Sequence, residues 1–387
     1  MWRRRIVAVL TVFMALTAAS GQIIPGACRT NGYFPLLGRK RIALVANHTS
    51  LVGSVHLLDT LLSSGLDVIK VFTPEHGFRG DLDAGVKVPA GRDAKTDLPV
   101  ISLYGKKVKP SPADLKGIDI VLFDLQDVGV RFYTYLSTLT YVMEACAENS
   151  VPLLVLDRPN PNGFYIDGPV LEPAFRSFVG LHPVPVVYGM TIGEYAQMVN
   201  GEHWLRDSLT CQLTVIPCFG YTHDSLYHLP VKPSPNLVDM RSVYLYPSLA
   251  FFEGTVISVG RGTMFPFQVY GHPSFQECTF SFIPTSIPGM SLHPPYAGKT
   301  CCGTDLRNFD ILILINKKEL IIDFLFDAYY RFPDKNKFFN SFFDLLAGTS
   351  ALREQIKGHY SEEDIRRSWL PGLTAFKEIR KKYLLYP

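Results

Sequence analysis

Hydrophobic and polar positions in the first half of the chain form two alternating patterns. Continuous apolar runs rich in β-branched residues are typical of strands buried on both faces, at 41–47, 67–73, 98–103, 118–124 and 151–157. Amphipathic stretches between or after them predict helices, at 56–64, 133–149 and 191–200. Because such strands need helices on both sides, this half predicts an α/β fold with a Rossmann-like parallel sheet.

The pattern changes after Asn236. Short strands interrupted by Pro and Gly dominate as far as Cys302, the run Ile311 to Lys317 predicts one more strand, and Glu319 to Tyr330 and the C-terminal residues read as helices. We therefore expect two domains: a Rossmann-like catalytic domain at 36–236, and a smaller α+β C-terminal domain at 237–387. We expect the second domain to complete a cleft at the edge of the first.

The N-terminus has the layout of a secretory signal peptide. The basic Arg3 to Arg5 precede a short apolar run from Ile6 to about Ala19 that ends in small residues, which predicts a signal peptide at 1–20 and cleavage near Ser20. An exported protein, periplasmic or secreted, is expected, with no stable membrane insertion after cleavage. Lipid attachment at Cys28 is the less favoured alternative, because Cys28 lies well past the apolar run.

Charge and cysteine usage exclude several classes of function. The chain has 38 basic and 35 acidic residues, and three of the basic ones lie in the signal segment, so the mature protein is neutral and no nucleic-acid partner is expected. Neither GxGxxG nor GxxxxGK[ST] occurs, and the seven cysteines lack metal-ligand spacing, so no cofactor and no metal are expected. Scattered cysteines (Cys146, Cys211, Cys218, Cys278) read as core residues, and no essential disulfide is predicted.

Polar residues follow four successive predicted strands. In open parallel sheets ligands bind beyond the carboxyl ends of the strands. The residues at these ends are Asn47, Glu75 with His76, Gln126 with Asp127, and Asp157 with Arg158. The sequence thus predicts a polar cleft along this edge, and Asn160, in the Asn/Pro-rich loop after Arg158, extends it.

Three carboxylates are the candidate catalytic residues. Glu75 lies in a rigid Thr-Pro-Glu-His-Gly turn directly after a strand and is the first candidate for general acid. Asp127 and Glu172 are candidates for the partner carboxylate, although Asp124 or Asp127 could instead hold Arg131 or cap the next helix. Glu194 is left out, because Thr191-Ile-Gly-Glu194 has the form of a capping box.

Several motifs in the same order resemble the exo-β-N-acetylmuramidases of the NamZ type, over about 38–386 of the chain. They are FTPEHGFRG (72–80), FDLQDVGVRFYTY (123–135), LDRPNPNG (156–163), YGMTIGE (188–194), PSPN (233–236), FFEGT (251–255) and SVGRGT (258–263). The resemblance implies a Rossmann-like domain plus a smaller C-terminal one, with a cleft between them. It also implies Glu75 as the leading catalytic residue.

The resemblance further implies a terminal β-linked N-acetylmuramic acid on a peptidoglycan-derived fragment as the substrate. Arg79, Asn236, Glu253 and Arg261 complete the predicted substrate-binding residues, and Arg261 is suited to a bidentate contact with the lactyl carboxylate. The alternative function is a non-catalytic exported sugar-binding protein that uses the same cleft. The sequence leaves the oligomeric state open.

Overall fold

A computed structural model describes residues 22–78 and 91–387 of the chain. The predicted signal peptide at 1–20 and the predicted substrate-binding residue Arg79 lie outside the described residues. No helix within these two ranges combines the length and the apolar character needed to cross a lipid bilayer.

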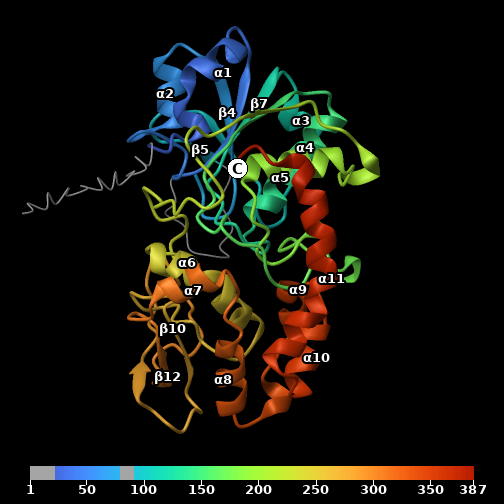
Figure 1. The fold of residues 1–387 in the computed structure, drawn as a ribbon. Helices are drawn as coiled ribbons and strands as arrows, with labels where there is room; N and C mark the ends of the chain where they lie inside the picture. Colours follow the sequence, from blue (N-terminus) through green and yellow to red (C-terminus); the bar gives the residue numbers. More distant parts are fainter. Residues whose placement is uncertain (1–21, 79–90) are drawn as a thin grey trace, which may run out of the picture.

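A seven-stranded sheet organises the first half of the molecule (Figure 1). Its order is β5-β6-β4-β1-β7-β8-β9, and every pair is parallel except β5 with β6. The strands are β1 (Ile42–Ala46), β4 (Val68–Thr73), β5 (Gly91–Arg92), β6 (Pro99–Ser102), β7 (Ile120–Asp124), β8 (Leu153–Leu156) and β9 (Leu213–Ile216). The predicted parallel sheet is confirmed, although β9 was not predicted.

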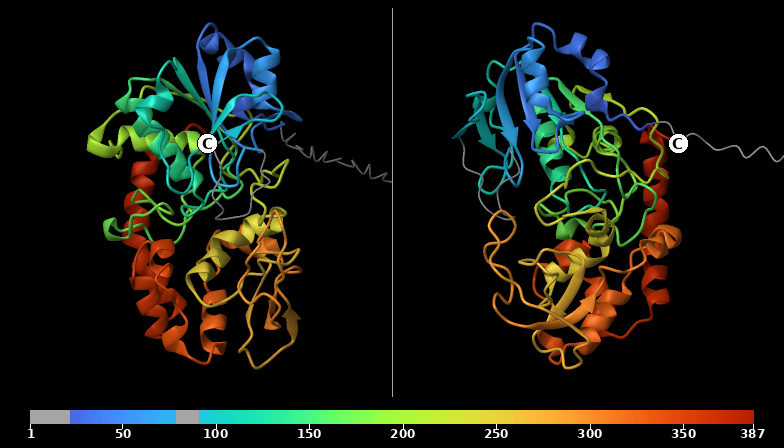
Figure 2. Two further views of the ribbon diagram at one scale, coloured as in Figure 1. Left: turned by 180° about the vertical axis from the view of Figure 1, so that it is seen from behind. Right: turned by 90° about the vertical axis from the view of Figure 1, so that its left-hand side faces the viewer.

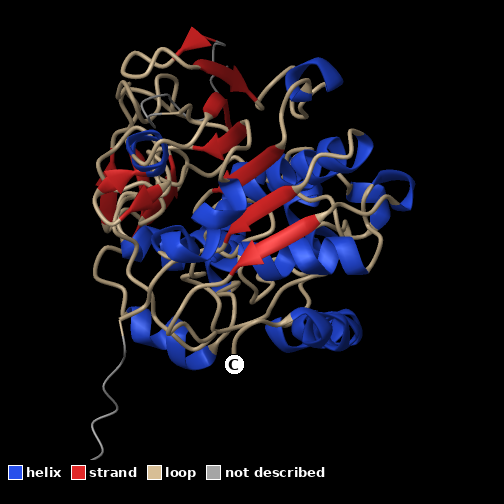
Figure 3. Ribbon diagram, turned by 90° about the horizontal axis from the view of Figure 1, so that it is seen from above, coloured by secondary structure: helices blue, strands red, loops and turns tan. Residues whose placement is uncertain are grey.

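Alternate residues of the central strands pack into two separate apolar clusters. In β1, Ala43 and Val45 join one cluster while Ile42 and Leu44 join the other. The second cluster is closed by α1 (Thr30–Leu37) and α2 (Leu57–Ser63), and the first by α4 (Tyr135–Glu148) and α5 (Ile192–Gly201). The layers of helix around the sheet are visible from above in Figure 3. Because the central strands are buried on both faces, their sequences are continuous apolar runs.

The remaining elements of the first half are short. They are the hairpin β2 (Leu51–Val52) with β3 (Val55–His56), the helix α3 (Pro112–Leu115), and the 3₁₀ turns η1 (Gly26–Cys28), η2 (Pro173–Phe175) and η3 (Arg206–Ser208).

At the start of α5, the side chain of Thr191 accepts a hydrogen bond from the Glu194 N–H, and the Glu194 carboxylate accepts one from the Thr191 N–H. The predicted capping box of α5 is confirmed.

The second half combines helices with a small antiparallel sheet of order β10-β12-β11. Its strands are β10 (Val269–His272), β11 (Phe280–Phe282) and β12 (Cys301–Asp305). Its helical segments are α6 (Met240–Leu249), η4 (Ala250–Gly254), α7 (Ile311–Lys317), α8 (Asp323–Arg331), η5 (Lys335–Lys337), α9 (Phe343–Ala347), α10 (Ala351–Lys357), α11 (Glu362–Arg380) and η6 (Lys381–Tyr383). The predicted α+β character is confirmed.

Two expectations for this half are wrong. Residues Ile311–Lys317 form the helix α7 and not a strand, because the Asp310 side chain caps the Leu312 N–H and the segment lies against α6 without a strand to pair with. Cys278 is not a core residue, since it forms a disulfide with Cys302. Antiparallel pairing of β11 with β12 brings these two cysteines together, which their spacing in the sequence did not indicate.

The end of the chain returns to the first half. Helix α11 runs along both halves, and the C-terminus lies beside the sheet of the first (Figures 1 and 2). The Leu385 N–H donates to Glu194, and the Pro387 carbonyl accepts from the His223 N–H. These contacts fix the last residues against the carboxyl edge of the sheet.

Candidate active site

A cavity of about 170 Å³ lies between the two halves of the molecule. The first half contributes Glu75, His76, Tyr104 and the start of α4 to its lining, and the second contributes residues that include Tyr246, Glu253, Arg261 and Phe267. Four predicted site residues, Glu75, His76, Glu253 and Arg261, thus meet in one cavity although the sequence separates them by up to 186 positions.

Glu75 is held by the turn that follows β4. The turn closes with a hydrogen bond from the Gly77 N–H to the Pro74 carbonyl, and His76 and Gly77 both adopt a left-handed backbone, with φ of 72° and 77°. A side chain at positive φ is uncommon and costs on the order of 1 kcal/mol or more, which is typical of functional turns. The geometry directs the carboxylate into the cavity.

The carboxylate of Glu75 meets polar groups of α4 and of a neighbouring loop. The Thr134 hydroxyl donates to Glu75 Oε2 over 3.1 Å, and Thr134 is the residue that precedes the first turn of α4. Burial and then the nearby Glu75 carboxylate raise the pKa of the Tyr104 hydroxyl, so Tyr104 stays protonated as a donor. Donors of this kind, together with the helix N-terminus, stabilise the carboxylate after it has released a proton.

Arg261 and Glu253 form an ion pair on the opposite wall. Arg261 Nε donates to Glu253 Oε1 over 2.6 Å, and the guanidinium carbon lies 5.1 Å from the centre of the Phe267 ring. The two side chains are about one-quarter exposed or less, so the pair is partly desolvated while still facing the cavity. Glu253 and Phe267 thus fix the orientation of the Arg261 guanidinium. A guanidinium held in this way is preorganised to bind an anionic ligand.

Aromatic side chains form most of the remaining wall. Phe132 contacts Tyr246 at a ring-centroid distance of 5.6 Å, and Tyr246 contacts Phe267 at 4.9 Å, both edge to face. Tyr133 stacks edge-on with Tyr135 at 4.7 Å. The cavity therefore presents rigid apolar faces between two carboxylates and one guanidinium, a lining suited to one polar sugar ring.

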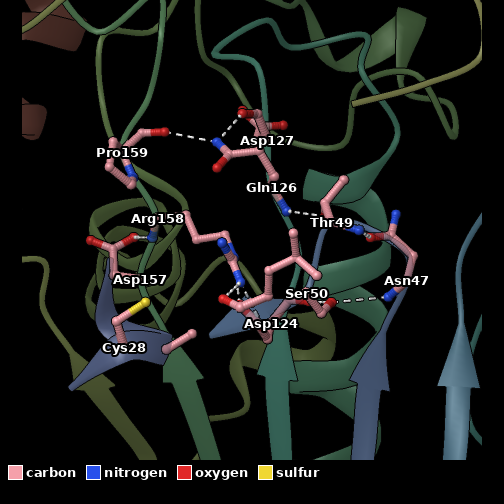
Figure 4. A network of polar contacts seen from close by, with 12 residues as sticks. Cys28, Asn47, Thr49, Ser50, Asp124, Gln126, Asp127, Asp157, Arg158 and Pro159 are labelled. Atoms are coloured by element: carbon pink, nitrogen blue, oxygen red, sulfur yellow. Dashed lines mark hydrogen bonds and ion pairs between the residues drawn. The ribbon is translucent and has the colours of Figure 1, made fainter. Parts of the chain in front are cut away.

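The other residues at strand ends form a buried network, shown in Figure 4. Arg158 donates from Nε and Nη2 to the two Asp124 oxygens over 2.5 and 2.8 Å, and this pair is almost wholly buried. Asp157 accepts from Thr191, from the Gly193 N–H and from the Tyr386 hydroxyl. Asp157 and Arg158 thus form their hydrogen bonds with other groups of the protein, and neither residue lines the cavity.

Asn47, Gln126, Asn160 and Asn236 are also buried and are not among the described residues that line the cavity. Asn160 binds the Met190 carbonyl, and Asn236 binds the Met290 carbonyl. Gln126 spans the carbonyls of Asp127 and Pro159. Asn47 donates to the hydroxyl of Tyr135, over 2.7 Å, so it orients a residue of the cavity wall from behind.

Asp127 is buried and does not line the cavity. Its Oδ2 accepts from the Gly129 N–H and from the Tyr188 hydroxyl, while Oδ1 is buried without a hydrogen-bond partner in the described part of the chain. Burial raises the pKa of Asp127 to about 6, although the Tyr188 contact opposes this. Asp127 does not hold Arg131, which instead donates to four backbone carbonyls, and it does not cap α4.

Glu172 lies outside the cavity lining. It is exposed, and its Oε1 accepts from the Thr349 hydroxyl over 2.6 Å. The sequence analysis missed most of the cavity lining, which includes the polar side chains of Tyr104, Thr134 and Tyr246. None of the three is a carboxylate that follows a predicted strand, which was the criterion used to select candidates. For Thr134, the run FYTY (132–135) close to a strand end was the one indication in the sequence.

Among residues 22–78 and 91–387, no group of three or more His, Cys, Asp or Glu side chains is arranged to hold a metal ion.

Comparison with known proteins accounts for nearly the whole described chain. The family model "Exo-beta-N-acetylmuramidase NamZ, N-terminal" matches residues 42–241, and its C-terminal counterpart matches residues 244–386. The chain belongs to the NamZ family. The curated relative "Peptidoglycan beta-N-acetylmuramidase NamZ" of Bacillus subtilis is 40% identical over 376 residues, which is 92% of this chain and 89% of the relative.

Two solved structures from Bacteroides fragilis share the NamZ fold, and both are described as DUF1343 family proteins. One is 48% identical with a TM-score of 0.88, and the other is 29% identical with a TM-score of 0.80. Each alignment covers 94% of this chain and 99% of the solved chain. These two structures therefore share the overall arrangement of the two halves with this chain.

Proposed function

We propose that this chain is an exo-acting glycoside hydrolase that releases terminal, non-reducing, β-linked N-acetylmuramic acid from peptidoglycan-derived fragments. The observation that carries the proposal is the meeting of Glu75, Glu253 and Arg261 around one aromatic cavity in a member of the NamZ family. The curated relative is named a peptidoglycan beta-N-acetylmuramidase, and the two matching family models are named for an exo-beta-N-acetylmuramidase.

In this proposal Glu75 is the general acid. It donates its proton to the glycosidic oxygen as the bond breaks, and the resulting carboxylate is stabilised by the Thr134 hydroxyl at the start of α4. The turn at His76 and Gly77 keeps the carboxylate at the cavity wall, so that the acid is aimed at the bond when the sugar is bound.

Arg261 is the proposed ligand of the lactyl carboxylate. Glu253 binds one edge of the guanidinium and the Phe267 ring lies beneath it, which leaves the remaining N–H groups for the substrate. Recognition of this carboxylate would distinguish N-acetylmuramic acid from N-acetylglucosamine, which lacks it.

The cavity lining indicates the second catalytic group. Glu253 shares the cavity with Glu75, whereas Asp127 is buried away from the lining and Glu172 lies outside it. We propose Glu253 as the second catalytic carboxylate, and Asp127 as a buried residue that holds Tyr188 and the Gly129 N–H in place.

We also propose that the protein is exported, on the basis of the N-terminal sequence. Cleavage near Ser20 fits the described fold better than processing at Cys28. Ile24 pairs with Phe219, and a Cβ on Gly26 would lie 2.3 Å from the Ile216 carbonyl oxygen. Processing at Cys28 would remove these packed residues. The intact mass of the protein recovered from its native cells distinguishes the two sites.

The test of the proposed activity is incubation of the mature protein with the disaccharide N-acetylmuramyl-β-1,4-N-acetylglucosamine, followed by mass spectrometry. We expect equimolar N-acetylmuramic acid and N-acetylglucosamine. If the disaccharide binds in calorimetry but stays intact, the sugar-binding alternative replaces the enzyme.

A further inference from the structure

A second, larger cavity of about 710 Å³ lies in the first half of the molecule. Its lining includes Lys109, Tyr141, Arg176, Trp204 and Arg206, and shares no residue with the described lining of the Glu75 cavity. Nothing in the proposed mechanism uses it.

The two cavities are neighbours along α4. Tyr135, at the start of this helix, lines the first cavity, and Tyr141 and Glu144 on the same helix line the second. Six residues of helix separate Tyr135 from Tyr141, which corresponds to about 9 Å. An extended ligand that leaves the first cavity in this direction reaches the second after a short segment.

Phe178 forms the partition between them. Its ring lies 6.0 Å from that of Tyr104, in the first cavity, and stacks at 6.3 Å on Tyr141, in the second. Within the same short segment, Val179 lines the first cavity and Arg176 lines the second. One continuous wall therefore serves both cavities.

Positive charge distinguishes the second cavity. The Arg176 guanidinium has no hydrogen bond or ion pair with the described residues, and its charge contributes, after burial, to lowering the pKa of His182 to about 3. Arg206 is paired only loosely with Asp207, at 3.6 Å and with both side chains more than 70% exposed. Two guanidinium groups are thus available to an anionic ligand, whereas Lys109 is already bound by Glu144 and Glu148.

The loop that carries Arg206 is held in an unusual backbone conformation. His203, Asp207 and Ser208 all have φ near +55°, and Trp204 between them stacks on His182 at a ring-centroid distance of 5.4 Å. Residues other than glycine are uncommon in this region of backbone space, and such strain is concentrated at binding and catalytic sites. The loop presents an aromatic ring and a guanidinium side by side, a pairing suited to a sugar that bears a carboxylate.

We propose that this second cavity binds the next muramyl residue of a longer glycan, the carboxylate-bearing sugar two positions from the one being released. The inference rests on the proposed function, because it assigns the terminal sugar to the Glu75 cavity. Muramyl and glucosaminyl residues alternate in peptidoglycan, so in a strand without stem peptides the sugar directly after the scissile bond carries no carboxylate and the following one does.

The test compares two substrates and two protein variants. The disaccharide N-acetylmuramyl-N-acetylglucosamine ends before the second cavity, whereas the tetrasaccharide made of two such units extends into it. For the double variant Arg176→Gln/Arg206→Gln, we expect KM for the tetrasaccharide to rise about tenfold, with kcat and the disaccharide kinetics unchanged. Arg367→Gln, on the exposed face of α11, is the matched charge control.

Each outcome decides the inference. Equal losses on both substrates, or no change on either, would overturn it. If the wild-type protein cleaves neither substrate, the proposed function fails by itself, and calorimetric titration of wild type and double variant with the tetrasaccharide then decides between a second anion site and none. Weaker binding by the double variant supports the site, and equal binding rejects it.

Discussion

The Glu75 cavity and the Asp157 network lie near the same carboxyl edge of one sheet, yet their polar groups serve different purposes. In the cavity, Glu75 and Arg261 line open space between the two halves of the molecule. In the network, Asp157 accepts from Thr191, Tyr386 and the Gly193 N–H, Arg158 donates to Asp124, and both residues are buried away from the cavity. A polar residue at a strand end is therefore a site candidate only when the tertiary structure places it at a cavity wall.

The largest expected effect is a loss of catalytic activity when Glu75, in the cavity, is replaced. Glu75→Gln should lower kcat by about 10²- to 10⁴-fold, because an amide cannot donate the proton that the leaving oxygen needs. Its free energy of unfolding should change far less than that of Arg158→Met, because glutamine has the same shape and can still accept from the Thr134 hydroxyl. Rates of N-acetylmuramic acid release and urea unfolding provide the two measurements.

Two further glutamate variants make this comparison specific. Glu363→Gln, 82% exposed on α11, controls for the loss of one charge and should match wild type. Glu172→Gln tests the third carboxylate predicted from the sequence, and its position outside the cavity leads us to expect a rate near wild type. A loss in Glu172→Gln as large as in Glu75→Gln would contradict the described site.

The next effect is a loss of stability when Arg158, in the buried network, is replaced. Arg158→Met leaves the buried Asp124 carboxylate without its partner and should cost about 3 to 5 kcal/mol of unfolding free energy. Arg41→Met removes the same two-point contact from Asp119 at the surface and should cost much less, because water solvates the Asp119 carboxylate that remains. Chemical denaturation of both variants is the measurement, and equal costs would show that burial is not what distinguishes the network.

A smaller effect tests how the substrate is recognised. Arg261→Gln should raise KM for a muramyl substrate by about 10- to 100-fold, because the lactyl carboxylate loses a charged partner. A substrate whose lactyl carboxyl is converted to an amide should already bind wild type weakly and lose little more with the variant. If both substrates lose equally, Arg261 supports the cavity wall and does not bind the carboxylate.

The last effect concerns pH. Burial is the main cause that raises the pKa of Asp157 to about 7, so the folded state binds the proton more tightly than the unfolded state does. The stabilisation from this group is complete below the unfolded pKa of about 3.9 and is lost as pH rises through about 7.

Asp157→Asn should therefore flatten the dependence of unfolding free energy on pH between about 4 and 7, by at most about 1.4 kcal/mol per pH unit. Unfolding curves for wild type and variant across this range measure the difference. Parallel pH profiles would show that Asp157 is charged in the folded protein throughout.

The sequence by itself determined the parallel sheet, most helices of the first half, the turn that holds Glu75 and the family resemblance. These features are local, since apolar periodicity, a capping box and a Pro-Glu-His-Gly turn each act over a few residues. The same local evidence mistook Ile311–Lys317 for a strand, because its β-branched composition does not reveal whether a partner strand is present.

Only the tertiary structure decided which polar residues face the cavity. Asp157 and Glu75 both follow apolar strands, and nothing in the sequence shows that the chain terminus returns to place Tyr386 on Asp157 while Arg261 comes from the other half to face Glu75. The pairing of Cys278 with Cys302 was settled in the same way, by the register of two antiparallel strands. Hydrogen-bond satisfaction and burial depend on contacts between distant segments, so they become visible only after the whole chain has folded.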